Sequence, residues 1–243
     1  MRQLPLGVQL PDHATFRNFH AGPNRACVDY MRALAERGGA PAAWLWGPPA
    51  AGKTHLLMAI CALALEHGRR AACVSLDRLH GSEAGVLAGL GDCAVVCIDD
   101  LEHAAGDAPR EAALFELFNR LQDAGGAMVA ASGRSPAALS FALPDLASRL
   151  RSGGVFGLGL LDDEDRLAAL RLRARHRGLV LPDDTGAYLL RRVPRDMSSL
   201  YQLLDSLDRE ALAAGRLLTV PFVRRVLADR GPWSSPSSPG PAA

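Results

Sequence analysis

The sequence has little net charge, no paired-cysteine motif and no long apolar run, and each shortage excludes a class of protein. Its formal charge is +1 over 243 residues, so the overall balance does not indicate a DNA coat or a membrane-surface protein. Any nucleic-acid contact would therefore be local. The five cysteines form no C-x-x-C pair and lie mostly in apolar runs. This is typical of reduced, buried thiols and predicts neither a disulfide framework nor a metal site.

No segment is apolar enough to cross a membrane, and the first residues lack the hydrophobic stretch of a secretory signal. We therefore expect a cytoplasmic protein with no membrane partner. With 49% apolar residues, the chain can bury one sizeable core, or one core and a small satellite. We expect two unequal domains.

Lysine is nearly absent. Histidines aside, every basic residue but one is arginine, and the single lysine is Lys53. Its position inside a phosphate-binding pattern indicates that an amine is required there. An arginine bias that left one lysine by chance is the alternative interpretation.

Short apolar runs alternate with helical patterns along the first two thirds of the chain. The runs expected to be strands are residues 42–46, 71–76, 94–98, 127–132 and 155–160. Residues 54–67 and 111–124 carry helical periodicity, and each of these segments is followed by a glycine. This alternation predicts an α/β fold, with a parallel sheet flanked by helices.

After residue 161 the pattern becomes helical, beginning with four acids at 162–165 that suit a helix N-terminus. The basic run that follows is interpreted as a solvated helix face, with phosphate contact as the alternative; it comprises Arg171, Arg173, Arg175, His176 and Arg177. The domains expected are an extended arm at 1–12, an α/β domain at 13–160, a small helical domain at 161–231 and a tail of disordered composition at 232–243.

Residues 47–54 read Gly-Pro-Pro-Ala-Ala-Gly-Lys-Thr and match G-x-x-x-x-G-K-[ST] between a predicted strand and a predicted helix. In such a loop the backbone N–H groups and the helix N-terminus face phosphate oxygens. Lys53 is expected to neutralise the phosphates, and Thr54 to offer its hydroxyl to Mg²⁺. A Gly/Pro-rich turn without a ligand is the alternative. The nucleotide-binding residues expected here are Gly47, Pro48, Ala51, Gly52, Lys53, Thr54 and His55.

Two acids, Asp99 and Asp100, end the apolar run at 94–98. Carboxylates at the end of a buried strand need a cation or a donor. Asp99 is expected to lie beside Mg²⁺, and Asp100 to orient or activate water for attack on the γ-phosphate. An ordinary Asp-rich turn is the alternative. Ser132, at the end of another run, is a candidate for the γ-phosphate region, or else a turn or helix-initiating serine.

Several further motifs are specific enough to compare with known families. They are Thr15-Phe16-Arg17-Asn18-Phe19, Gly22-Pro23-Asn24, Asp99-Asp100-Leu101-Glu102, Leu-Pro-Asp-Leu-Ala-Ser-Arg-Leu at 143–150, and Pro221-Phe222-Val223. With the phosphate loop, they resemble the AAA+ family of the bacterial replication initiator DnaA and its truncated relative Hda, the regulatory inactivator of DnaA. The resemblance runs from the N-terminal arm to about residue 231.

The resemblance implies roles for residues outside the loop. Phe16, Phe19 and Asn24 would lie beside the adenine and ribose of ADP or ATP. Arg149 would be an arginine finger presented to nucleotide on a neighbouring subunit, a role that suits a rigid, permanently charged guanidinium. Arg195 would reach the phosphates from the helical lid.

The first residues are similar to the peptide with which such proteins dock on the β sliding clamp of DNA polymerase III, loaded on DNA. Gln3, Leu4 and Leu6 would fill the clamp's hydrophobic pocket, and a frayed terminus is the alternative. The pattern departs from the family at Gly7 and Val8, where a larger apolar residue is usual.

The implied function is a negative regulator of chromosomal replication initiation, nucleotide-bound and clamp-tethered, that stimulates ATP hydrolysis by DnaA. At most weak ATPase activity is expected, because Asp100 is shorter than the usual catalytic glutamate. The DNA-binding helix-turn-helix of DnaA has no counterpart here, so sequence-specific DNA binding is not expected. Homodimerisation is left open. The alternative function is an AAA+ motor or loader that remodels a partner such as a helicase.

Overall fold

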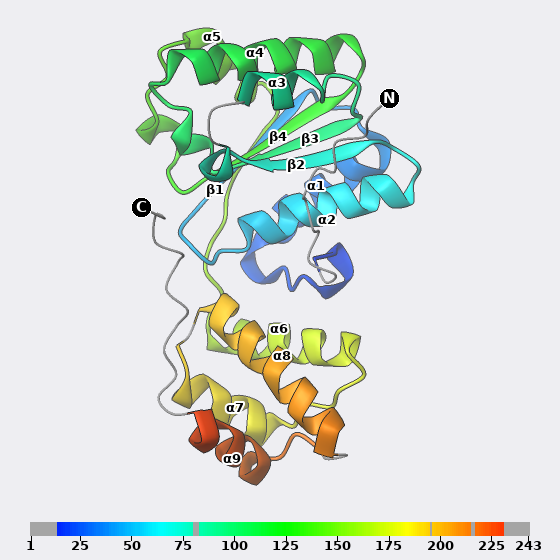
Figure 1. Cartoon of the computed structure of the whole chain (residues 1–243), viewed down its shortest axis with the longest axis vertical. Coiled ribbons are helices and arrows are strands. Elements are labelled where there is room, and N and C mark those ends of the chain that lie inside the picture. The colour runs from blue at the N-terminus through cyan, green and yellow to red at the C-terminus, as the bar shows by residue number, and fades with distance from the viewer. Residues whose placement is uncertain (1–13, 80–82, 195, 215–216, 231–243) are drawn as a thin grey trace. The chain divides into compact units, whose positions relative to one another are not determined.

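The computed structural model describes residues 14–79, 83–194, 196–214 and 217–230. The chain divides into two compact units, Met1–Leu160 and Leu161–Ala243, which we call the α/β unit and the helical unit. Each is described by itself (Figure 1). The predicted arm at 1–12 and tail at 232–243 lie outside the described residues.

The α/β unit is built on a five-stranded parallel sheet with the order β2-β3-β4-β1-β5. Its strands are β1 (Ala42–Trp46), β2 (Ala71–Ser75), β3 (Val95–Asp99), β4 (Ala127–Ser132) and β5 (Gly154–Gly157). Strands β3 and β4 are buried along their whole length, which explains why they read as unbroken apolar runs. The predicted fold class is confirmed.

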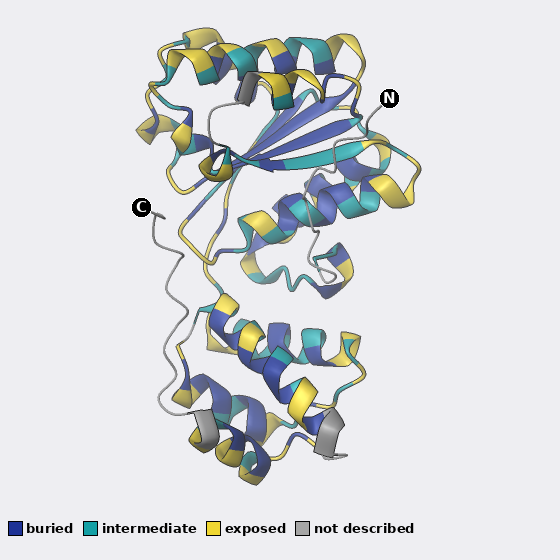
Figure 2. Cartoon of the chain, viewed as in Figure 1, coloured by how far each residue is buried: buried dark blue, intermediate teal, exposed yellow. Residues whose placement is uncertain are grey.

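Helices cover both faces of this sheet. One face packs against α1 (Arg25–Arg37) and α2 (Lys53–Glu66), and the other against α3 (Glu83–Ala88), α4 (Ala108–Asp123) and α5 (Pro144–Leu150). Figure 2 shows the buried strands between helices whose outer faces are exposed. The short 3-10 turns are η1 (Phe16–Asn18), η2 (Gly22–Asn24), η3 (Leu76–Arg78), η4 (Leu101–His103) and η5 (Pro136–Ala138).

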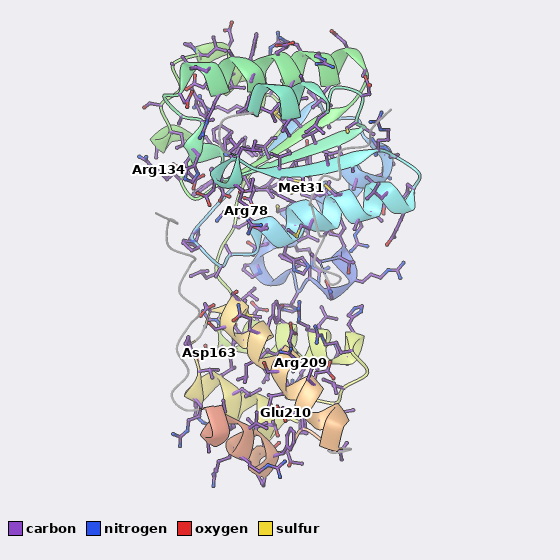
Figure 3. All side chains as sticks on the ribbon, in the orientation of Figure 1. Met31, Arg78, Arg134, Asp163, Arg209 and Glu210 are labelled. Carbon is purple, nitrogen blue, oxygen red and sulfur yellow. The ribbon has the colours of Figure 1, made fainter. Side chains whose placement is uncertain are left out.

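Alternating side chains of β4 divide the interior into two cores. Val129 and Ala131 belong to the core shared with α1 and α2, and Met128 and Ala130 to the core shared with α4. Met31 of α1, labelled in Figure 3, is fully buried in the first of these cores.

Strand β5 ends earlier than predicted. The expected strand at 155–160 is wrong at its C-terminal end, because the ladder stops where β1 ends. The Leu158 N–H donates to the Trp46 carbonyl at 2.7 Å. The next residue, Gly159, instead hydrogen-bonds the side chain of Asn24 through both its N–H (2.9 Å) and its carbonyl (3.1 Å).

The helical unit contains α6 (Asp163–His176), α7 (Asp183–Arg192), α8 (Met197–Ala214) and α9 (Val220–Arg230). The Asp162 carboxylate caps α6 by accepting the Asp165 N–H at 2.8 Å, as the acidic start of this segment predicts. Leucines 203, 204 and 207 of α8 are fully buried at its centre. Within the described ranges, no helix is long and apolar enough to cross a membrane.

The basic run at the end of α6 is only partly the solvated face that the sequence predicts. Arg175 and His176 are exposed, whereas Arg171, Arg173 and Arg177 are half-buried and paired. The guanidinium of Arg177 pairs with Asp205 at 3.0 Å and Asp208 at 3.1 Å, and Arg173 lies 3.5 Å from Asp205. Arg171 also pairs with Asp183. These contacts join the run to α7 and α8 and neutralise these three arginines within the unit, which removes them as phosphate ligands.

Candidate nucleotide-binding site

The carboxyl ends of the central strands meet at one edge of the sheet. Trp46 ends β1 in register with Ser132, which ends β4, and the Gly47 N–H donates to the Ser132 carbonyl at 3.2 Å. Asp99 ends the neighbouring strand β3. Parallel pairing through β4 therefore places the loop after β1 at the same edge as the acid that ends β3, where open α/β sheets bind their ligands.

The loop at 47–52 has a backbone that few residues tolerate. Gly52 has φ +95°, and a Cβ on it would lie 2.8 Å from the Phe19 ring. Ala50 also adopts a left-handed φ of +62°. Left-handed residues in such a turn direct successive N–H groups inward and form a cradle for anions. Helix α2 then begins at Lys53 without a side-chain cap, which leaves its first N–H groups for a ligand.

Lys53 hydrogen-bonds back to this loop. Its Nζ donates to the carbonyl oxygens of Gly47 at 2.8 Å and Pro48 at 3.0 Å. Both acceptors are neutral, so the hydrogen bonds hold the ammonium in the loop without cancelling its charge. The positive charge is thus available to a phosphate group.

Thr54 and Asp99 meet across the site. The Thr54 hydroxyl donates to Asp99 Oδ2 at 2.5 Å, and the Asp100 N–H donates to Oδ1 at 3.0 Å. Burial raises the pKa of the Asp99 carboxyl, and the nearby Asp100 charge raises it further, while the Thr54 hydrogen bond and Lys53 oppose the shift. A buried carboxylate beside a hydroxyl offers the hard oxygen ligands that Mg²⁺ prefers, so these residues fit the ion.

Asp99→Asn should stabilise the nucleotide-free chain at neutral pH by about 0.5 to 2 kcal/mol, the usual range for stabilising substitutions. Burial raises the pKa of folded Asp99 above its unfolded value. The folded state therefore favours the protonated carboxyl, and this contribution to stability is lost as pH rises through the folded pKa.

Urea unfolding at several pH values measures this effect, and the advantage of the variant should shrink in acid. Asp92→Asn is the matched control, because the Asp92 side chain is 82% exposed and should change little. A variant less stable than the wild type at neutral pH would contradict the prediction.

Asp100 is held toward the neighbouring strand. It has φ +57°, and its Oδ2 accepts a hydrogen bond from the Ser75 hydroxyl at 2.7 Å. Ser75 ends β2. A role in orienting water would require Asp100 to release this serine or to act through its other oxygen.

Ser132 is fully buried, and its hydroxyl is already engaged. It donates to the Arg134 carbonyl at 2.7 Å and accepts from Trp44 Nε1 at 2.9 Å. The side chain lies on the sheet face that carries Trp44, so contact with a phosphate would require the bond to Arg134 to break.

The residues before α1 that were expected to contact the nucleotide lie in two different environments. Phe19 lies against Gly52, and its ring packs on His55 with centroids 5.1 Å apart. Phe16 is instead a core residue, 7% exposed, with the Arg32 guanidinium 5.2 Å from its ring centroid. The Asn24 side chain hydrogen-bonds the backbone of Gly159. Phe19 and His55 therefore line the loop, whereas Phe16 and Asn24 hold the segment in place.

Comparison with known proteins agrees with this geometry. Residues 163–227 match the lid domain of Hda. The structure is similar to domain III of the replication initiation protein DnaA from Thermotoga maritima, with 26% identity over 90% of this chain and 97% of that one, and a TM-score of 0.74. Residues 163–227 therefore form an Hda-type lid domain, and the chain has the AAA+ fold seen in DnaA.

More distant structures share the AAA+ fold. AMPPCP-bound DnaA from Aquifex aeolicus is 23% identical over 81% of this chain and 66% of that one, with a TM-score of 0.66. The RuvB Holliday junction branch migration motor of Thermotoga maritima is 16% identical over 88% of this chain and 73% of that one, with a TM-score of 0.60. At these identities the likeness shows the fold alone.

The predicted finger of this AAA+ protein lies on α5. Arg149 Nη1 donates to Gln122 Oε1 of α4 at 2.9 Å, and the guanidinium lies 5.8 Å from the Phe115 ring centroid. Its side chain thus contacts α4.

Glu111 is a buried site-positioning residue that the sequence analysis did not identify. Its carboxylate is fully buried and accepts the N–H groups of Gly106 (2.7 Å), Ala142 (3.0 Å) and Leu143 (2.6 Å). The last two precede α5, so Glu111 fixes the start of the helix that carries Arg149. The signal was present, since Glu111 shares a helical face with Leu114 and Phe118, where an acid is unusual.

Four predicted residues cannot be placed. Arg195 of the Hda lid lies outside the described residues, as do Gln3, Leu4 and Leu6 of the predicted clamp-binding arm. Their roles remain predictions.

Proposed function

We propose that this DnaA-related AAA+ protein is a negative regulator of replication initiation. It binds ADP or ATP with Mg²⁺ and is tethered to the DNA-loaded β sliding clamp through Gln3, Leu4 and Leu6. It supplies Arg149 in trans to the ATP site of DnaA, where the guanidinium stimulates hydrolysis.

Nucleotide binding is supported by the geometry of the loop. The left-handed backbone at Ala50 and Gly52, the uncapped start of α2 and the Lys53 ammonium all converge on one anion-binding region. Thr54 and Asp99 supply oxygen ligands for the accompanying cation. When bound, Mg²⁺ would offset charge on the phosphates. A DnaA of the same fold has been solved with AMPPCP, which agrees with an adenine nucleotide.

The observation that carries the regulatory role is the state of Arg149. Among the described residues, its side chain has no carboxylate partner, and its hydrogen bond is to the neutral amide of Gln122. Stacking beside Phe115 keeps the guanidinium on the α4 surface. Its full charge and most of its N–H donors are therefore available to phosphate oxygens of another molecule.

Two contacts favour a regulator over a self-sufficient motor. Asp100 is held by Ser75, and the Ser132 hydroxyl is held between Trp44 and Arg134. Both side chains would have to change partners before they could assist hydrolysis in this chain. We therefore expect weak intrinsic turnover.

The test is ATP hydrolysis by purified DnaA with this protein and DNA-loaded clamp, each also assayed alone. Gln3→Ala/Leu4→Ala should remove most of the clamp-dependent stimulation, because a short docking peptide depends on its few anchor side chains. The chain offers a matched control in its second Gln-Leu pair, and Gln9→Ala/Leu10→Ala should retain stimulation.

Stimulation that needs all three components and falls only in the Gln3/Leu4 variant supports the proposal. Brisk hydrolysis by this protein alone, indifferent to the clamp, would instead favour the motor or loader function. Equal losses in both arm variants would remove the tethering role from Gln3 and Leu4.

A further inference from the structure

Helices α7 and α9 of the lid lie side by side (Figure 1) and gather arginines around two aromatic rings. The guanidinium groups of Arg192 of α7 and Arg224 of α9 lie 5.7 Å and 5.9 Å from the centroid of the Tyr188 ring. Arg225 lies 5.5 Å from the centroid of Phe222. We call these five residues the basic lid face.

The three arginines of the basic lid face are exposed, and among the described residues none of them forms an ion pair. Their state contrasts with Arg173 and Arg177 of α6, which the lid neutralises with its own aspartates. Three arginines without an ion pair are thus gathered at α7 and α9 in a chain whose overall charge is only +1. An unpaired cluster of this kind is the local basic patch that a near-neutral protein would need to contact a polyanion.

Stacking gives the cluster a defined geometry. A guanidinium that lies over an aromatic face is held in orientation by the ring quadrupole, while its N–H edges remain free to donate. Arg192 and Arg224 share the ring of Tyr188, so one ring holds two such donors. Paired guanidinium groups suit phosphate oxygens, which accept two parallel hydrogen bonds.

The same stacking disfavours single-stranded nucleic acid. Base stacking needs a free aromatic face, but two guanidinium groups already lie over the Tyr188 ring, and Phe222 is 4% exposed beneath Arg225. The charge of the face is also of one sign, which matches the closely spaced phosphates of a duplex. An acidic protein surface is the competing occupant, and the experiment distinguishes it.

We propose that the basic lid face binds the phosphate backbone of duplex DNA without reading its sequence. The proposal goes beyond the regulatory function and does not depend on it, because the contact requires neither nucleotide nor DnaA. It also agrees with the expectation that the chain does not recognise a specific DNA sequence.

The test measures fluorescence anisotropy of labelled duplexes of two unrelated sequences with the full chain, without nucleotide, across a salt series. Both duplexes should bind alike. Arg192→Gln/Arg224→Gln should weaken binding at low salt at least about 10-fold and make the slope of log K against log salt shallower by about 2, since each lost phosphate contact contributes about 0.9. Glutamine keeps most of the aliphatic stem that covers Tyr188.

Arg175→Gln/Arg209→Gln is the matched control, because it removes the same charge from exposed positions on α6 and α8 (Arg209 is labelled in Figure 3). This control should bind as the wild type does. Arg192→Lys/Arg224→Lys should restore the salt slope, because lysine retains the charge but not the fork. Melting curves of all variants identify any loss of fold.

Three results would overturn the proposal: no binding to either duplex, equal losses in the two glutamine variants, or tighter binding to poly-glutamate than to duplex at equal salt. The last would identify an acidic protein surface as the partner. Lys53→Ala keeps the two proposals separate, because it should abolish nucleotide binding and leave duplex binding unchanged.

Discussion

Arg149→Ala should leave nucleotide and clamp binding intact and reduce stimulated hydrolysis by DnaA by a factor of about 10³ to 10⁵, the contribution of an arginine finger supplied in trans. The substitution should have little effect on the fold, since the side chain makes one hydrogen bond to Gln122 and lies beside the rings of Phe115 and Phe118. A single-turnover assay with ATP-bound DnaA, loaded clamp and each variant measures the rate.

Two neighbouring substitutions make this result specific. Arg151→Ala removes an exposed arginine two positions away, whose side chain donates to the Pro136 carbonyl at 2.9 Å, and it should retain stimulation. Gln122→Ala removes the neutral hydrogen-bond partner of Arg149 and should keep stimulation within about 10-fold of wild type, the scale of one neutral hydrogen bond. Retained stimulation by Arg149→Ala would sink the finger assignment.

Lys53→Arg should weaken binding of a fluorescent adenine nucleotide analogue by about 10- to 100-fold, the equivalent of one charge-assisted hydrogen bond. Charge is conserved in this variant, so the effect isolates geometry. The lysine ammonium is a compact donor that fits between the Gly47 and Pro48 carbonyls. A planar guanidinium is larger and presents its donors in a fixed fork. Equilibrium titration with Mg²⁺ present gives the affinity.

Arg37→Lys is the control for this substitution, because it introduces a lysine at an exposed position in the last turn of α1. Its affinity should equal that of the wild type. If Lys53→Arg also binds normally, the single lysine of the chain has no special role, and the arginine bias alone explains its rarity.

The sheet was predictable because its signal is local. Parallel strands buried on both faces read as apolar runs, and β1 and β4 have the predicted bounds, Ala42–Trp46 and Ala127–Ser132. The end of β5 was not predictable. It depends on where β1 ends and on the hydrogen bonds that Asn24 makes to Gly159, 135 positions away.

The site divides in the same way. The phosphate loop is a contiguous motif, so the position of Lys53 at its end could be inferred from sequence. The partners of Ser132 and Asp100 could not. Trp44 and Ser75 lie on other strands, and only the assembled sheet brings them to these side chains.

The arginines of the lid show a similar limit. Sequence spacing places Arg173 and Arg177 on one face of a helix, but it does not show that Asp205 of α8 lies opposite them. Nor does it distinguish these paired side chains from Arg192 and Arg224, which share an aromatic ring instead. In an arginine-rich chain, the side chain that each arginine contacts, rather than the residue type, shows whether its charge is neutralised within the fold or can bind a ligand.

The hydrogen bonds of Lys53 make nucleotide entry an exchange of partners rather than a simple addition. The ammonium already donates to two carbonyl oxygens of its own loop, which act as an intramolecular competitor of the phosphates. A measured affinity therefore reports the difference between the two sets of bonds and understates the strength of the lysine–phosphate contact. It follows that a change that withdraws these carbonyls would tighten nucleotide binding without adding any contact to the ligand.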